Sequence, residues 1–76
     1  MEMALSELGV NISAKIKKIT STDSILTKKL LSMGILKGVE ITVTKKSLLG
    51  DPIEVKIRGY NLSLRKDEAS QILIEI

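Results

Sequence analysis

Apolar and polar residues alternate along much of this 76-residue chain. Residues 39–44 and 53–58 place an apolar side chain at every second position, and residues 72–76 repeat the pattern more briefly. Residues 13–20 begin in the same way, but the phase slips at Lys18. Because successive side chains of a β-strand point to opposite faces, these runs predict strands with one buried and one wet face, and a bulge or strand end at the slip.

The period changes to that of a helix over residues 24–33. Three apolar residues spaced by about one helical turn predict a single buried stripe, formed by Leu26, Leu30 and Met33. Asp23 or Ser24 can accept the free N–H groups of the first turn, and Gly34 can end the helix in a left-handed conformation. A second, single helical turn is expected over residues 66–70.

The apolar parity reverses after residue 58, where Leu62 becomes the next apolar position. A two-residue turn with Gly59 and Tyr60 at its centre explains the reversal, because it sets Ile57 opposite Leu62. Glycine in the first central position favours a type II′ turn. Together the patterns predict one domain over residues 1–76, a small β-barrel of about five strands with the helix inserted after the first strand.

Composition removes most kinds of chemistry. The chain has no Cys and no His, and its carboxylates are scattered. We therefore expect no disulfide, metal site or cofactor, and no enzymatic activity. The glycines lack the spacing of a phosphate-binding loop. No stretch is apolar over the roughly 20 residues that a membrane span needs, so we expect a cytosolic protein.

Net charge and aromatic content limit the partners. The net charge is +3, but the charges alternate with apolar residues instead of forming a block, which favours a solvated face. Grooves for proline-rich segments and platforms for single-stranded nucleic acid both need several aromatic rings. Tyr60 is the only aromatic residue, so neither ligand is expected.

Three stretches, "LLSMGILKGVEITV", "LLGDPIEVKIRGYNLSLRKDEASQI" and "LSELGVNISAKI", resemble the FeoA family of small proteins of bacterial ferrous iron uptake. The most specific matches are Met33-Gly34 followed by Gly38, then Gly50-Asp51-Pro52, and Arg58-Gly59-Tyr60. One departure is Val10-Asn11, where the family commonly has a Pro-Gly turn. Asparagine tolerates the left-handed conformation, so the turn is expected to survive.

This resemblance implies an SH3-like barrel, a fold that also forms the C-terminal domain of some metal-dependent repressors. It implies an accessory protein that binds the cytosolic region of FeoB, the membrane ferrous iron transporter, to assemble it or regulate its nucleotide cycle. Membrane contact is expected only through that partner, and self-association stays open. The alternative is a regulatory barrel akin to the repressor domains, with weak nucleic-acid association.

Four residues are the candidate contacts with this partner. Arg58 and Tyr60 are expected at the hairpin tip, either as an interface anchor or with the ring folded over aliphatic neighbours. Leu48 and Leu49 form an apolar pair in a loop, where one is expected to plug the barrel end and the other to dock a partner.

The remaining conspicuous residues are expected to be structural. Asp51 is expected to fix its own turn through a side-chain-to-backbone hydrogen bond. If the strands at residues 39–44 and 53–58 pair in matching parity, Glu40 and Arg58 face each other on the wet side. The residues assigned to structural turns are Gly34, Gly38, Gly50, Asp51, Pro52 and Gly59.

Overall fold

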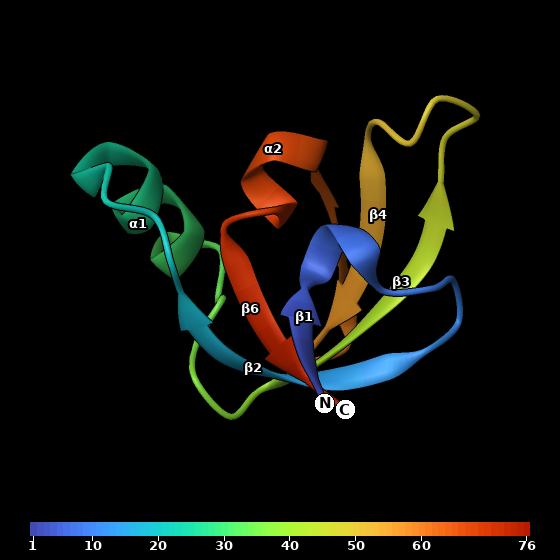
Figure 1. The fold of residues 1–76 in the computed structure, drawn as a ribbon, viewed down its shortest axis with the longest axis horizontal. Coiled ribbons are helices and arrows are strands. Elements are labelled where there is room, and N and C mark those ends of the chain that lie inside the picture. The colour runs from blue at the N-terminus through green and yellow to red at the C-terminus, as the bar shows by residue number, and fades with distance from the viewer.

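A computed structural model describes residues 1–76 as a strongly curved sheet with a helix beside it (Figure 1). The elements are β1 (Glu2–Ala4), the 3-10 turn η1 (Leu5–Glu7), β2 (Ser13–Ile19), α1 (Ser24–Ser32), β3 (Glu40–Lys46), β4 (Ile53–Ile57), β5 (Tyr60–Leu64), α2 (Lys66–Ala69) and β6 (Ile72–Glu75). All strand pairs are antiparallel, in the order β1-β6-β2-β3-β4-β5. The edge strands β1 and β5 do not pair with each other, so the sheet rolls up without closing.

The alternating runs form the strands that they predict. In β3 and β4 the register sets Ile41 opposite Ile57, and both side chains are buried. The phase slip in β2 is a bulge, because the register with β6 shifts between Ile16 and Lys18. Fifteen buried apolar residues make up one core, which the curved sheet encloses.

The chain start adds a strand that the sequence pattern did not predict. β1 pairs with β6, and the following turn buries Leu5 and Leu8 completely in the core. The sheet therefore has six strands instead of about five, and the helix follows the second strand instead of the first. Asn11 has a φ of 66°, so the expected left-handed turn before β2 is confirmed.

Helix α1 has the predicted ends. Asp23, not Ser24, is the N-cap, and its carboxylate accepts hydrogen bonds from the amides of Ile25 and Leu26. Leu30 is fully buried, and Leu26 and Met33 pack against the core, as the stripe predicts. Neither α1 nor α2 has the length and apolar character that a membrane-spanning helix requires.

The β4–β5 turn differs from the prediction by one position. Arg58 and Gly59 occupy its centre with φ values of 50° and 86°, and Ile57 pairs with Tyr60 instead of Leu62. Two positive φ values are typical of a type I′ turn, which suits the twist of a hairpin. The predicted type II′ turn is therefore wrong, and Tyr60 is the first residue of β5.

Candidate partner-binding surfaces

The loop between β3 and β4 presents two apolar side chains to solvent. Leu48 and Leu49 have exposed fractions of 101% and 89%. The expectation that one of them plugs the barrel end is therefore wrong. Neither leucine belongs to the core, which is made up mainly of residues of the sheet and helices together with Leu5 and Leu8. We call Leu48 and Leu49 the leucine tip.

Hydrogen bonds hold the base of the leucine tip. The Gly50 amide donates to the Ser47 carbonyl at 2.8 Å, and the Asp51 amide donates to the Ser47 hydroxyl oxygen at 2.9 Å. The Ser47 hydroxyl in turn donates to the Asp51 carbonyl. The leucine tip therefore projects from an ordered loop, which lowers the conformational entropy that is lost when a partner binds.

The Asp51 side chain has a structural role, but its hydrogen bond is not made within its own turn. Its carboxylate accepts a hydrogen bond from the Lys66 amide at 3.0 Å, at the start of α2. That amide is one of the donors that a helix leaves free at its N-terminus. The expected local side-chain hydrogen bond is replaced by one that links the loop to α2, because the fold brings positions 15 residues apart together.

Tyr60 holds β5 against the end of α1. Its hydroxyl donates to the Met33 carbonyl at 2.7 Å, and its side chain remains 42% exposed. A Cβ atom on Gly34 would overlap the hydroxyl oxygen of Tyr60, so glycine leaves the room that this contact needs. Of the two hypotheses for Tyr60, an interface anchor or a ring folded over its own protein, the second is closer to the structure.

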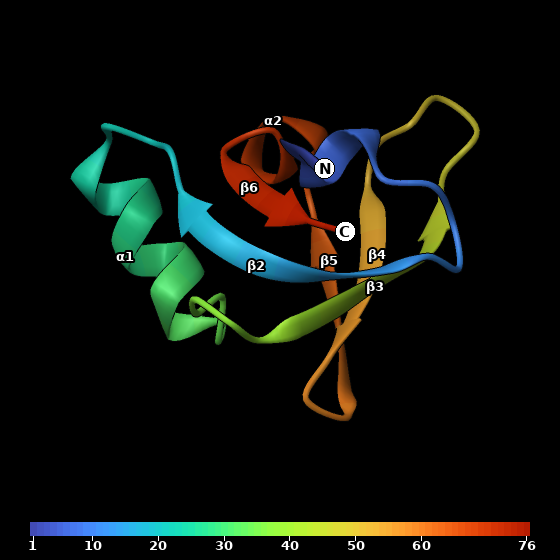
Figure 2. The same ribbon diagram turned by 60° about the horizontal axis from the view of Figure 1, so that its bottom comes forward.

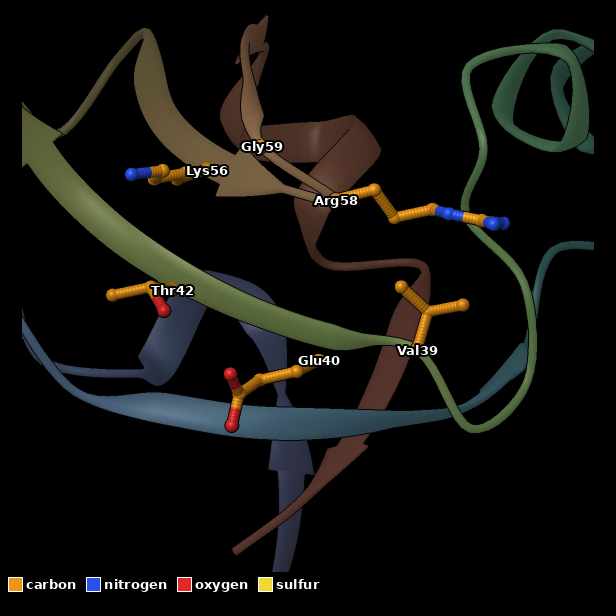
Figure 3. Close-up of a pocket in the computed structure, with 6 residues that line it drawn as sticks. All are labelled: Val39, Glu40, Thr42, Lys56, Arg58 and Gly59. Carbon is orange, nitrogen blue, oxygen red and sulfur yellow. The ribbon is translucent and has the colours of Figure 1, made fainter.

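Arg58 lies at the turn but does not pair with Glu40. The strand register matches the expected parity, and both residues line one hollow of about 480 Å³ on the outer face of the sheet. Figure 3 shows that Lys56 and Arg58 point in opposite directions, with Arg58 extending toward the loop that joins α1 to β3. The ion pairs of the structure are formed by other residues, so the expected Glu40–Arg58 pair is absent.

The four candidate contact residues do not form one surface. The leucine tip precedes β4, whereas Arg58 and Tyr60 follow it, and Figure 2 shows the two connections at opposite ends of this strand. Five strand residues separate them by about 16 Å. The structure therefore divides the predicted contact region into the leucine tip and the hairpin end.

A second link, which the sequence did not reveal, fastens α1 to the body of the protein. The Lys29 ammonium donates to the Glu68 carboxylate at 2.7 Å, and the Arg65 amide donates to the same carboxylate at 2.9 Å. Glu68 is only 8% exposed. The Lys29 contact, together with the Arg65 hydrogen bond, holds the pKa of the Glu68 carboxyl below its usual value. No local signal connects residues 39 positions apart.

No three His, Cys, Asp or Glu side chains gather in the structure as a metal site would require. Gly34, Gly38, Gly50 and Gly59 all have positive φ values, in agreement with their assignment to turns. Large apolar side chains are also exposed outside the leucine tip and the hairpin end, and these are Met1, Val10, Ile12, Ile25, Leu31, Leu36 and Ile76.

Comparison with known proteins gives these surfaces a context. A profile of the FeoA domain matches residues 3–76. The chain is 36% identical over 74 residues to an Fe(2+) transport protein A/Fe(2+) transporter FeoB fusion protein of Porphyromonas gingivalis. The match covers 97% of this chain and 9% of the fusion protein, so it spans only a small part of that relative.

Solved structures agree with the sequence match. The FeoA-like protein of Clostridium acetobutylicum is 40% identical, with a TM-score of 0.89 over 99% of this chain and 86% of that protein. Stenotrophomonas maltophilia FeoA, described as a prokaryotic SH3 domain protein and solved with zinc, is 26% identical, with a TM-score of 0.85 over 96% of this chain and 89% of that protein.

A manganese-dependent transcriptional repressor shares the fold alone, at 18% identity and a TM-score of 0.89 over 97% of this chain and 41% of the repressor. The predicted SH3-like fold, and its occurrence in a metal-dependent repressor, are thereby confirmed. A domain of this kind occurs in Fe(2+) transport proteins. The chain belongs to the FeoA family.

Proposed function

We propose that this protein is a non-enzymatic accessory of ferrous iron uptake that binds the cytosolic region of a FeoB-type transporter. The observation that carries the proposal is the Porphyromonas gingivalis fusion, in which a domain 36% identical to this chain is part of one polypeptide with a FeoB transporter. Covalent linkage gives two modules a high effective concentration, which benefits modules that work in contact. On this proposal the protein works in the cytoplasm and reaches the membrane through its partner.

The leucine tip is the proposed primary contact. Two neighbouring leucines that are almost completely exposed bury apolar area as soon as a partner covers them, and burial is worth about 25 cal/mol per Å². The hydrogen-bonded loop beneath them holds the pair in place before binding. Arg58 and Tyr60 are proposed as a separate, secondary contact, because they lie at the other end of β4.

The proposal is tested by titrating the purified cytosolic region of the transporter into the protein and measuring the affinity by calorimetry. The double variant Leu48→Asp/Leu49→Asp should weaken binding at least about tenfold, because charged side chains replace the apolar contact. Its unfolding midpoint should stay close to that of the wild type, since neither leucine contributes to the core.

Ile25→Asp/Leu31→Asp is the matched control for this experiment. Ile25 and Leu31 are exposed apolar residues of α1, away from the leucine tip, so their replacement introduces the same two negative charges on a different surface. We expect it to bind like the wild type. Equal losses in the leucine variant and the control would reject the leucine tip as the contact, and no binding by the wild type would reject the partner.

A further inference from the structure

The outer face of the sheet carries a row of three neighbouring hollows, which we call the furrow and which is separate from the leucine tip. Their volumes are about 480, 390 and 210 Å³. The first and second share Glu40, and the second and third share Lys15 and Glu75, so the row extends over β6, β2, β3 and β4. Three strand spacings give the furrow a length of about 14 Å, which matches about four residues of extended peptide.

The residues that line the furrow carry a net positive charge. Its charged residues are Lys15, Lys17, Lys37, Glu40, Lys56, Arg58 and Glu75. Five cations and two carboxylates leave an excess of three positive charges, which equals the net charge of the whole chain. Elsewhere on the protein, positive and negative side chains therefore balance.

The charges follow an order along the furrow. At its centre, the strand register places Lys15 between Glu75 and Glu40, which leaves this part slightly negative. Lys37 lines the hollow at one end of the row, and Lys56 and Arg58 line the hollow at the other. Figure 3 shows the side chains of Lys56 and Arg58 pointing away from each other, with Arg58 directed toward the loop that joins α1 to β3. The two ion pairs of the structure are Lys17 with Glu2 and Lys29 with Glu68, so the three cations at the ends have no carboxylate partner.

From this order we propose that the furrow binds an extended, acidic peptide segment of a partner protein. Acidic side chains at both ends of the segment would meet the unpaired cations, and a basic or neutral residue between them would meet the central carboxylates. Electrostatic complementarity of this kind selects a partner and sets its register. The inference goes beyond the proposed association with the transporter and does not depend on it.

A nucleic-acid strand fits the furrow less well than a peptide. A phosphate backbone carries evenly spaced negative charges, and it would bring some of them against Glu40 and Glu75. No aromatic side chain lines the furrow, so bases would have no ring on which to stack. The charge order therefore favours a peptide with a patterned sequence over a uniform polyanion.

The test uses the full chain and three synthetic probes. The first is a five-residue peptide with two glutamates at each end and a central lysine, the second has the same composition with the four glutamates contiguous, and the third is a short oligothymidylate. Amide chemical shifts of the ¹⁵N-labelled protein report where each probe binds. We expect the first peptide to give saturable shifts at Lys15, Glu40 and Arg58 that weaken at higher salt, because these charges are exposed.

Charge reversal identifies the residues responsible. Lys56→Glu/Arg58→Glu should weaken binding of the first peptide at least about tenfold, and Lys37→Glu is a second variant at the other end of the furrow. Lys45→Glu/Lys66→Glu makes the same change in charge outside the furrow and should bind within about twofold of the wild type. Equal binding of all three probes, equal losses in the control, or no saturable shift with the first peptide would each overturn the inference.

Discussion

Tyr60 and Gly34 show how single residues determine the position of α1. The Tyr60 hydroxyl reaches the Met33 carbonyl only because Gly34 has no side chain in its way. Gly38 has a similar positive φ, of 86° against 90°, but nothing lies within 4 Å of the position that its Cβ would occupy. A substitution at either glycine strains the backbone, but only one at Gly34 also disturbs the contact with Tyr60. Comparing the two substitutions therefore distinguishes the effect of backbone strain from the effect of that contact.

We predict that Gly34→Ala destabilises the protein by about 1 kcal/mol more than Gly38→Ala, which is the net value of a lost hydrogen bond. Both variants carry the strain of a left-handed alanine, but only the first displaces the Tyr60 hydroxyl. The free energy of unfolding in urea measures the difference. In a Tyr60→Phe background the difference should vanish, and an undiminished difference there would show that the hydroxyl is not its cause.

Glu68 links stability to pH. Its pKa is lowered in the folded protein, by the hydrogen bond from Lys29 first and by the Arg65 amide next. A carboxyl with a lowered folded-state pKa stabilises the fold above its unfolded-state pKa of about 4.3, and this stabilisation is lost as the pH falls through the folded-state value.

We therefore predict that Glu68→Gln lowers the free energy of unfolding at pH 7. The difference in this free energy between the variant and the wild type, here called the gap, should become smaller as the pH falls below about 4.3. Chemical denaturation at a series of pH values measures the gap. Glu54→Gln is the control, because Glu54 is exposed and forms no ion pair. A gap for Glu68→Gln that stays constant down to pH 2 would contradict the linkage.

At the scale of elements, α1 depends on its N-cap residue, Asp23. The Asp23 carboxylate accepts two amides of the first turn, whereas the neighbouring Ser24 side chain makes no such contact. We predict that Asp23→Ala lowers the free energy of unfolding by about 1 kcal/mol, the usual value of an N-cap. Thermal unfolding followed by circular dichroism measures this. Ser24→Ala should change it by less than about 0.5 kcal/mol, and the reverse order would mean that Ser24 is the cap.

Alternation and helix punctuation were enough to predict β2, β3, β4, α1 and the last strand. They could not settle the hairpin register, because moving the turn by one position still pairs inward residues with inward residues. The overlooked signal is that Tyr60, Leu62 and Leu64 continue one alternating series, which already places Tyr60 in a strand. β1 has only three residues and no clear alternation, so only its pairing with β6 makes it a strand.

At the scale of the whole molecule, sequence could name candidate contacts but not their arrangement. The leucine tip was found because apolar loop residues are unusual, yet its exposure depends on a core that Leu5 and Leu8 complete from the other end of the chain. The furrow was missed, because its cations come from three separate segments that the sheet brings together. Spacing along the chain gives no sign of such a cluster.

We propose that this protein binds the cytosolic region of a FeoB-type transporter through the leucine tip. The most direct measurement is a titration of the unlabelled cytosolic region into the ¹⁵N-labelled protein, followed by amide chemical shifts and line widths. We predict saturable changes centred on Leu48, Leu49 and the loop that carries them. A spectrum that stays unchanged up to about 1 mM of the cytosolic region would show that the two proteins do not bind through this loop. A dissociation constant of about 1 mM corresponds to a binding free energy of about −4 kcal/mol.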